Sequence, residues 1–416
     1  MPFETLKRSH LKRNIIIGVI VVAIISAIIL NFTKAKYRVT QSIPLVNGTI
    51  NYSPGDIIIS AYFNDELLKS FPTKDSGYIV ESITCDKGAS ATFNEDIWEI
   101  EVTNLVTKGT KCDVTFIEKI SAKDTILANT KVNEGIPDFS QTATTNEGMY
   151  KAEDNLGTSY YFRGAVTNNY VQFAGFYWRI IRINGNDSIR IIYQGETPTA
   201  TGENAQIGTS AFNNSINRSE YVGLKYTINQ QHGQDTTSNI LSLINEWYSN
   251  NNVDNYEKYI DKEIGFCSDR NMASGSSWGS QPSNTIYYAA YERLALTKNP
   301  SLQCNEMDLL QIPIGLITAD EVNMAGGLYG NLNSNYYLNT GKEYWTMTPY
   351  ILLTSVDGLE RGAYVFLVWN HGGLSQDYVT VEYTSGGVRP VLNLSADVKL
   401  IGTGTSTDPY RIEGAE

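Results

Sequence analysis

Apolar and polar residues alternate along the chain from about residue 37 to residue 120. The segments 55–63, 77–85, 98–106 and 112–120 alternate most clearly and are rich in β-branched residues. This is the pattern of strands that bury one face. It predicts a small antiparallel β-sandwich over 37–120. Candidate acids, bases and nucleophiles do not cluster in this module, so we interpret it as a stalk or spacer.

The polar segment 121–149 is rich in Thr, Asn, Asp and Glu and contains Pro137. It is predicted to be a linker. Beyond it, two strand-like segments, 178–183 and 188–193, flank Asn184-Gly185, which is a strong signal for a β-hairpin. A second domain is therefore predicted over 150–416.

Helical spacing appears later in this domain. Apolar residues in 238–249 recur on one helical face behind the capping residue Ser238 or Thr237. A short helix is predicted to begin behind Thr318 and to end at Gly326-Gly327. Strand-like segments return from Tyr344 onward. The pattern as a whole predicts an α+β fold.

The longest apolar run, Ile15–Leu30, follows Lys7, Arg8, Lys12 and Arg13. It is shorter than the about 20 residues of a usual membrane span and slightly longer than the apolar core of a signal peptide. No obvious small-residue cleavage site follows it. We favour a transmembrane anchor over a cleaved signal peptide. Residues 1–36 would then be a cytoplasmic tail and single membrane-spanning helix, with the bulk of the chain outside the cell.

The amino-acid composition limits which kinds of partner are expected. The formal net charge is −12, and no basic stripe follows the first residues, so nucleic acid is not an expected partner. The chain has 27 tyrosines and only 18% charged residues, a mixture that favours strands and loops.

Four cysteines suit an exported chain, and they allow three pairings. If the two predicted domains fold separately, the pairs are Cys85 with Cys112 and Cys267 with Cys304. The second pair would hold a loop-rich insert. The sequence contains no CxxC motif, so a zinc site is not expected. We predict no metal site and no cofactor.

Several segments carry a family resemblance: "YYFRGAVTNNYVQFAGFYWRIIRI", "PIGLITADEVNMAGGLYG", "YYLNTGKEYWTMTP" and "GGVRPVLNLSADVKL". Together they resemble a family of uncharacterised surface proteins from low-GC gut bacteria. The resemblance implies a C-type-lectin-like domain, a fold shared with formylglycine-generating enzymes and with the variable proteins of diversity-generating retroelements. It covers roughly residues 150–412. The segment "SGYIVESITCDKG…KGTKCDVTF" also resembles the β-module that often precedes this domain.

In that family the last strands interleave fixed frame positions with variable display positions. The resemblance assigns the frame to Trp345, Pro349, Ala363, Val365, Phe366, Val368, Gly372, Leu374, Val379, Gly387, Val388, Arg389 and Pro390. Arg389 would pair with a buried carboxylate or with backbone oxygens. The display positions, which would bind the ligand, are Tyr350, Ile351, Leu352, Leu353, Thr354, Ser355, Tyr364, Leu367, Trp369, Asn370, His371, Gln376, Tyr378, Glu382 and Tyr383.

Exposed tyrosine and tryptophan give binding surfaces a large contact area at a low entropic cost. The alternative is that the apolar display positions simply complete the core. Both interpretations of these residues stay open at the level of the sequence.

Enzyme and lectin chemistry have weaker support. Neither His232 nor His371 has a serine-and-carboxylate pattern nearby. Formylglycine-generating enzymes use a reactive cysteine pair near the end of the domain, whereas Cys267 and Cys304 lie upstream. The triplets Gln281-Pro282-Ser283 and Trp369-Asn370-His371 depart from those of calcium-dependent lectins, so no calcium site is expected.

The preferred hypothesis is a cell-surface adhesin-like or receptor-like protein that displays a variable binding face. Its ligand would be a protein or glycan on another cell or phage, and a retroelement could diversify the face. The alternatives are an enzyme of the formylglycine-generating, sulfatase-modifying class, a hydrolase on the same fold, and a structural envelope protein.

Overall fold

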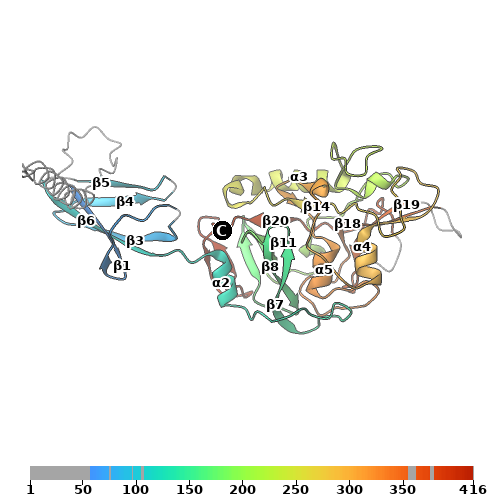
Figure 1. Cartoon of the computed structure of the whole chain (residues 1–416), viewed down its shortest axis with the longest axis horizontal. Helices are drawn as coiled ribbons and strands as arrows, with labels where there is room; N and C mark the ends of the chain where they lie inside the picture. Colours follow the sequence, from blue (N-terminus) through green and yellow to red (C-terminus); the bar gives the residue numbers. More distant parts are fainter. Residues whose placement is uncertain are drawn as a thin grey trace, which may run out of the picture. The chain divides into compact units, whose positions relative to one another are not determined.

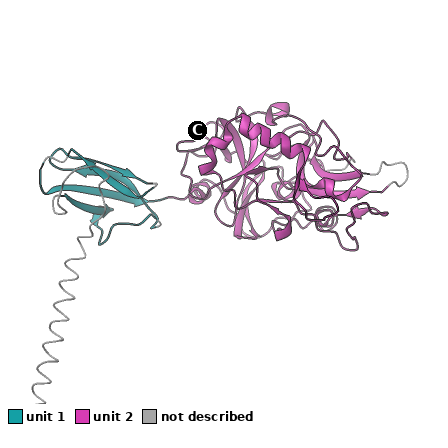
Figure 2. Cartoon of the chain, turned by 90° about the horizontal axis from the view of Figure 1, so that it is seen from above, with its two compact units in different colours: residues 1–119 teal, residues 120–416 magenta. Residues whose placement is uncertain are grey.

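A computed structural model describes residues 57–415, except 75, 96, 105–106, 355–361 and 375–378. The chain divides into two compact units, unit 1 (Met1–Lys119) and unit 2 (Ile120–Glu416), shown separately coloured in Figure 2. The predicted anchor Ile15–Leu30 lies outside the described residues. Within the described part of the chain, no helix is long and apolar enough to cross a membrane.

Unit 1 is built from a four-stranded sheet and a hairpin. The sheet has the order β2 (Glu66–Leu67), β1 (Ile57–Phe63), β6 (Thr110–Glu118), β3 (Tyr78–Cys85), and the hairpin joins β4 (Ser90–Asn94) to β5 (Glu99–Thr103). Ile100 of the hairpin and Phe116 of the sheet are buried in one core. The Cys85–Cys112 disulfide joins β3 to β6.

One pairing in unit 1 differs from the antiparallel prediction. Strand β1 runs parallel to β6, with Ile57 opposite Thr110. Parallel neighbours need a long connection, and here the β2–β5 segments supply it. Alternation along a strand identifies its buried face but not the direction of its partner, so the sequence could not reveal this pairing.

Unit 2 has a nine-stranded sheet at its centre. Seven strands follow the order β17 (Ile314–Gly315), β20 (Val391–Leu394), β11 (Ile189–Gly195), β10 (Phe176–Ile183), β9 (Tyr170–Phe173), β22 (Tyr410–Ile412), β21 (Leu400–Ile401), and β7 (Asn146–Asp154) pairs with β8 (Gly157–Gly164), which pairs with β10. The predicted hairpin is confirmed: β10 and β11 are antiparallel, with Ile183 opposite Ile189.

A second, three-stranded sheet has the order β15 (Ile286–Tyr287), β18 (Tyr344–Leu353), β19 (Gly362–Val368). The helices are α2 (Ala122–Ala128), α3 (Asn239–Asn250), α4 (Ala289–Tyr291), which runs into a wider turn at Glu292–Leu296, and α5 (Ala319–Ala325). Short pairs complete the unit: β12 (Lys225–Tyr226) with β13 (Thr236–Thr237), and β14 (Phe266–Cys267) with β16 (Leu309–Leu310). Figure 1 shows these elements.

The predicted linker 121–149 is instead part of unit 2. Ser121 caps α2 by accepting a hydrogen bond from the backbone N–H of Asp124 at 3.0 Å. Ala122 and Ile126 of this helix are fully buried in the unit 2 core. The polar composition of the segment concealed these two apolar contacts, which only packing against the distant sheet creates.

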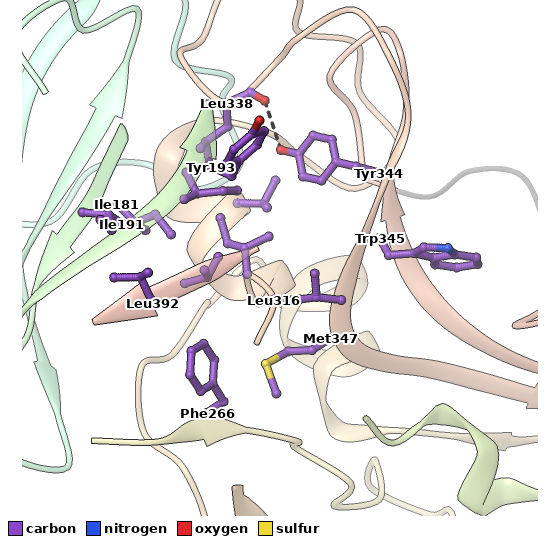
Figure 3. Packing of buried hydrophobic residues seen from close by; sticks show 14 of the residues in the cluster. Ile181, Ile191, Tyr193, Phe266, Leu316, Leu338, Tyr344, Trp345, Met347 and Leu392 are labelled. Carbon is purple, nitrogen blue, oxygen red and sulfur yellow. Dashed lines mark hydrogen bonds between the residues drawn. The ribbon is translucent and has the colours of Figure 1, made fainter. Parts of the chain in front are cut away.

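The two sheets of unit 2 share one apolar core (Figure 3). Ile181 and Ile191 lie on the neighbouring strands β10 and β11, and Phe266 and Met347 contribute from β14 and β18. The hydroxyl of Tyr344 donates to the backbone oxygen of Leu338 at 3.1 Å. The described chain is thus a sheet-rich α+β protein with two disulfides, as predicted at this coarse level.

Candidate ligand-binding cavity

A cavity of about 280 Å³ lies within unit 2. Its walls come from the β7–β8 turn, strands β10 and β11, residues 263–269, residues 301–309 and the start of α5. The charged side chains lining it are Asp154, Arg182, Arg190, Glu263, Asp269, Arg293, Glu306, Asp320 and Glu321. Both cysteines of the Cys267–Cys304 disulfide also line it.

Glu321 is the centre of one cluster of charges. Its Oε1 atom lies 3.0 Å from Nε of Arg182 and 2.6 Å from Nε of Arg190. Its Oε2 atom accepts from the backbone N–H of Thr318 at 2.9 Å, in a capping box at the start of α5. Burial by itself would raise the pKa of Glu321, but the two guanidinium groups and this N–H hold it below its ordinary value.

Arg182 and Arg190 are directly opposite each other on β10 and β11. Two like charges in this position would destabilise the sheet, and Glu321 between them compensates for it. Arg182 also donates from Nη1 to Oδ2 of Asp154 at 2.8 Å. Burial lowers the pKa of Arg190 to about 10, and its guanidinium stacks 4.4 Å from the ring centre of Phe266.

Arg293 is the centre of a second cluster. It donates from Nη2 to Oδ2 of Asp269 at 2.5 Å and to Oδ2 of Asp320 at 2.9 Å, and from Nε to Oδ1 of Asp320 at 3.1 Å. Asp269 has the left-handed backbone angle φ of 46°, which is uncommon for a residue other than glycine. Burial raises the pKa of Asp269 to about 6, against the opposing effect of Arg293.

Three polar groups on the lining retain capacity for a ligand. Nη2 of Arg182, Nη1 of Arg293 and Oδ1 of Asp269 form no hydrogen bond with any described residue. The rest of each side chain is nevertheless fixed by ion pairs. These three atoms belong to side chains that line the cavity.

Five of the predicted ligand-binding residues are buried and do not reach the surface. Tyr350, Ile351, Leu352, Tyr364 and Leu367 are each at most 4% exposed. They lie on β18 and β19, whose described residues are buried along nearly their whole length on both faces. The ring of Tyr350, for example, packs 4.7 Å from that of Phe366. These five side chains complete the core, which corrects the expectation that they face a ligand.

Seven other predicted ligand-binding residues reach the surface to some degree. Asn370 and Glu382 are exposed, and the half-buried ones are Leu353, Thr354, Trp369, His371 and Tyr383. A tight turn follows Trp369: the backbone N–H of Gly372 donates to Trp369 O at 2.8 Å. The binding role of this turn stays a prediction. Ser355, Gln376 and Tyr378 lie outside the described residues, and none of the other twelve lines the cavity.

Two of the predicted frame positions have clear packing roles. Trp345 is fully buried, and its Nε1 donates to Ser210 O at 2.8 Å. Arg389 is also fully buried and donates to backbone oxygens, namely Tyr193 O at 3.1 and 3.0 Å and Leu338 O at 2.9 Å. Of the two partners predicted for Arg389, the structure shows backbone oxygens.

Sequence reasoning missed the cavity residues and one histidine contact. Nδ1 of His232 lies 2.9 Å from Oδ1 of Asp308, a carboxylate 76 positions away. Arg270 contacts the same oxygen at 3.2 Å, and the ring of His232 bonds to no described hydroxyl group. The one available signal for the cavity was the presence of three arginines, Arg179, Arg182 and Arg190, in the largely apolar segments 178–183 and 188–193, because charged residues are rarely buried unless paired. Of these three, Arg182 and Arg190 line the cavity.

Among the described residues, no group of three or more histidine, cysteine or acidic side chains is placed to hold a metal ion. Comparisons of the chain with family models, with curated proteins and with solved structures find no match.

Proposed function

We propose that this chain is a cell-surface binding protein whose unit 2 takes a ligand into the charged cavity. The observation that carries this proposal is the set of available polar atoms on Arg182, Arg293 and Asp269 around about 280 Å³ of space. A concave site with a few convergent polar groups is the usual form of a small-ligand site.

The cavity is also preformed. Asp154 and Glu321 fix Arg182, and Asp269 and Asp320 fix Arg293. Side chains that are already ordered lose little entropy when a ligand binds, which favours affinity.

Location at the cell surface has separate support. Each unit contains a disulfide, and disulfides persist mainly in oxidising compartments. The apolar run Ile15–Leu30 with its basic flank would anchor the chain. Unit 1 would act as the stalk, and unit 2 would be the C-type-lectin-like head. The turn at Trp369–His371 is a second contact that we propose for a protein or glycan ligand.

The formylglycine-generating alternative has less support from the site. Its chemistry needs a thiolate nucleophile, because the protonated or bridged sulfur does not attack. Cys267 and Cys304, which line the cavity, are bonded to each other.

A pair of matched variants tests the binding site. Leu156 lines the cavity and is 53% exposed, whereas Leu296 is 63% exposed and does not line it. Leu156→Trp should narrow the cavity without disturbing the core, and Leu296→Trp should not affect it. Thermal shift would be measured with amines, amino acids, monosaccharides and sugar acids, since a ligand raises Tm when it binds the folded state.

At least one of these ligand classes should stabilise the wild type and Leu296→Trp, and should fail to stabilise Leu156→Trp. If no class does so, or if Leu156→Trp responds as the wild type does, the cavity is not the binding site.

A further inference from the structure

The charges around the cavity do not balance. In the two clusters, the arginines Arg182, Arg190 and Arg293 contact four carboxylates, which belong to Asp154, Asp269, Asp320 and Glu321. The lining also includes Glu263 and Glu306, both exposed. A cavity with an excess of one sign concentrates ligands of the opposite sign. Its electrostatics therefore favour a cation.

Three of the four clustered carboxylates already use both oxygens. In Glu321, Oε1 forms ion pairs with Arg182 and Arg190, and Oε2 accepts from Thr318 N. In Asp320, Oδ1 accepts from Ser301 N at 2.9 Å and from Arg293, which also contacts Oδ2.

Both carboxylate oxygens of Asp154 also accept hydrogen bonds. Its Oδ1 accepts from Leu156 N at 2.8 Å, and its Oδ2 accepts from Gly185 N at 2.9 Å and from Arg182. These bonds hold the β7–β8 turn to the β10–β11 turn. Asp154 therefore supports the wall, and its carboxylate has little capacity left for a ligand.

Asp269 is different. Only its Oδ2 is engaged, by the single contact from Arg293, and its Oδ1 accepts no hydrogen bond from a described residue. Its side chain is 13% exposed, so it is largely shielded from bulk water. It is the one clustered carboxylate with an available oxygen, and it lines the cavity.

We infer that the cavity binds the ammonium group of a primary amine, with Oδ1 of Asp269 as its acceptor; this inference rests on the proposed function. An ammonium group is a compact cation with three donors and no acceptor, which suits a single open carboxylate oxygen. The apolar side chains of Leu156, Ile264, Leu302 and Leu309 also line the cavity. They would cover the alkyl part of the amine.

The groups around Asp269 should make the affinity for an amine depend on pH. Burial raises its pKa to about 6, Arg293 lowers it, and Asp320 and Asp308 raise it. An ammonium ligand interacts with the ionised form alone. An amine should therefore bind about tenfold more weakly at about pH 5 than at about pH 7, in proportion to the ionised fraction of Asp269.

Isothermal titration of the full chain in detergent with matched five-carbon probes tests the inference. Cadaverine carries ammonium groups, pentanediol is neutral, and glutarate is anionic. We expect cadaverine to bind, pentanediol to bind at least about tenfold more weakly, and glutarate not to bind, because charge-assisted hydrogen bonds are the strong ones. Asp269→Asn should weaken cadaverine binding by about tenfold or more. The control is Asp187→Asn, since Asp187 pairs with Lys123 at 2.7 Å outside the cavity.

Equal or tighter binding of pentanediol or glutarate would overturn the inference, and so would unchanged cadaverine affinity in Asp269→Asn. If that variant does not fold, the probe series and its pH dependence in the wild type decide the matter. If cadaverine does not bind, but Leu156→Trp abolishes stabilisation by another ligand class, the amine inference is wrong and the proposed function stands. Should Leu156→Trp block no class at all, both are wrong.

Discussion

The side chain of Asn155 and the backbone of Cys304 form two reciprocal hydrogen bonds. Nδ2 of Asn155 donates to Cys304 O at 2.8 Å, and Oδ1 accepts from Cys304 N at 2.7 Å. The amide thus pairs with the backbone as a neighbouring strand would, across 149 positions of sequence. This pair of hydrogen bonds lies next to the isolated β-bridge between Asp154 and Leu302. The β7–β8 turn is thereby fixed to the disulfide-bearing wall of the cavity.

Asn155→Ala should loosen this wall. Two hydrogen bonds at an exposed site contribute about 1–2 kcal/mol to the free energy of unfolding. We expect a loss of that size in urea unfolding, with faster hydrogen exchange in residues 301–306. Asn214→Ala is the control, because Asn214 is exposed and bonds to described residues through its backbone N–H and not through its side chain. Exchange in 301–306 that matches this control would contradict the prediction.

Replacing Cys267 and Cys304 by serine should destabilise unit 2 and weaken ligand binding. The bridge closes a separation of 37 residues, for which chain entropy predicts about 3–4 kcal/mol. Replacing Cys85 and Cys112 is the matched control, since that bridge belongs to unit 1. Calorimetric unfolding and titration with cadaverine would be measured for both variants. An equal effect of both on binding would show that the second bridge does not shape the cavity.

Trp345→Ala and Trp369→Ala should separate a core residue from a surface residue. Loss of a fully buried tryptophan costs about 3–5 kcal/mol, and Trp345 is fully buried with its Nε1 hydrogen-bonded. Trp369 is half-buried, and its Nε1 has no hydrogen-bond partner among the described residues, so its loss should cost about 1 kcal/mol. Denaturant unfolding would measure both. If the two variants lose equal stability, Trp369 is a core residue and not part of a binding surface.

The stability of unit 2 should depend on pH through Asp269. Its folded-state pKa of about 6 lies above the ordinary value near 4. The folded state therefore binds this proton more tightly than the unfolded state, and ionisation destabilises the fold as pH rises from about 4 to about 6. Relative to Asp269→Asn, the wild type should lose about 1–3 kcal/mol across that window. Urea unfolding of both proteins at several pH values checks this, and a constant difference between them would contradict it.

The predicted anchor Ile15–Leu30 leads to a test in cells. We expect the full-length chain in the membrane fraction, with unit 1 and unit 2 accessible to protease added outside, because a basic flank is retained on the cytoplasmic side. N-terminal sequencing of released material provides the check. Chain recovered from the medium with a new N-terminus near residue 31 would show that the segment is a cleaved signal peptide.

The sequence alone determined the local elements and the two disulfide pairs. Asn184-Gly185 predicted the β10–β11 hairpin, and Ser238 predicted the start of α3, which it caps. These features depend on residues close together in the chain, where turn chemistry and helical spacing act directly. The cysteine pairs followed from the expectation of two separate domains, since each pair lies within one unit.

Only the tertiary structure decided which residues are buried and which share a site. The family resemblance placed Tyr364 and Leu367 at the surface, but they lie in the core, because β18 and β19 are covered on both faces. The cavity joins Arg182, Asp269 and Glu321, which are separated by 87 and 52 positions, since 269 − 182 = 87 and 321 − 269 = 52. No local pattern encodes such a meeting, because the charges compensate one another only after the chain has packed.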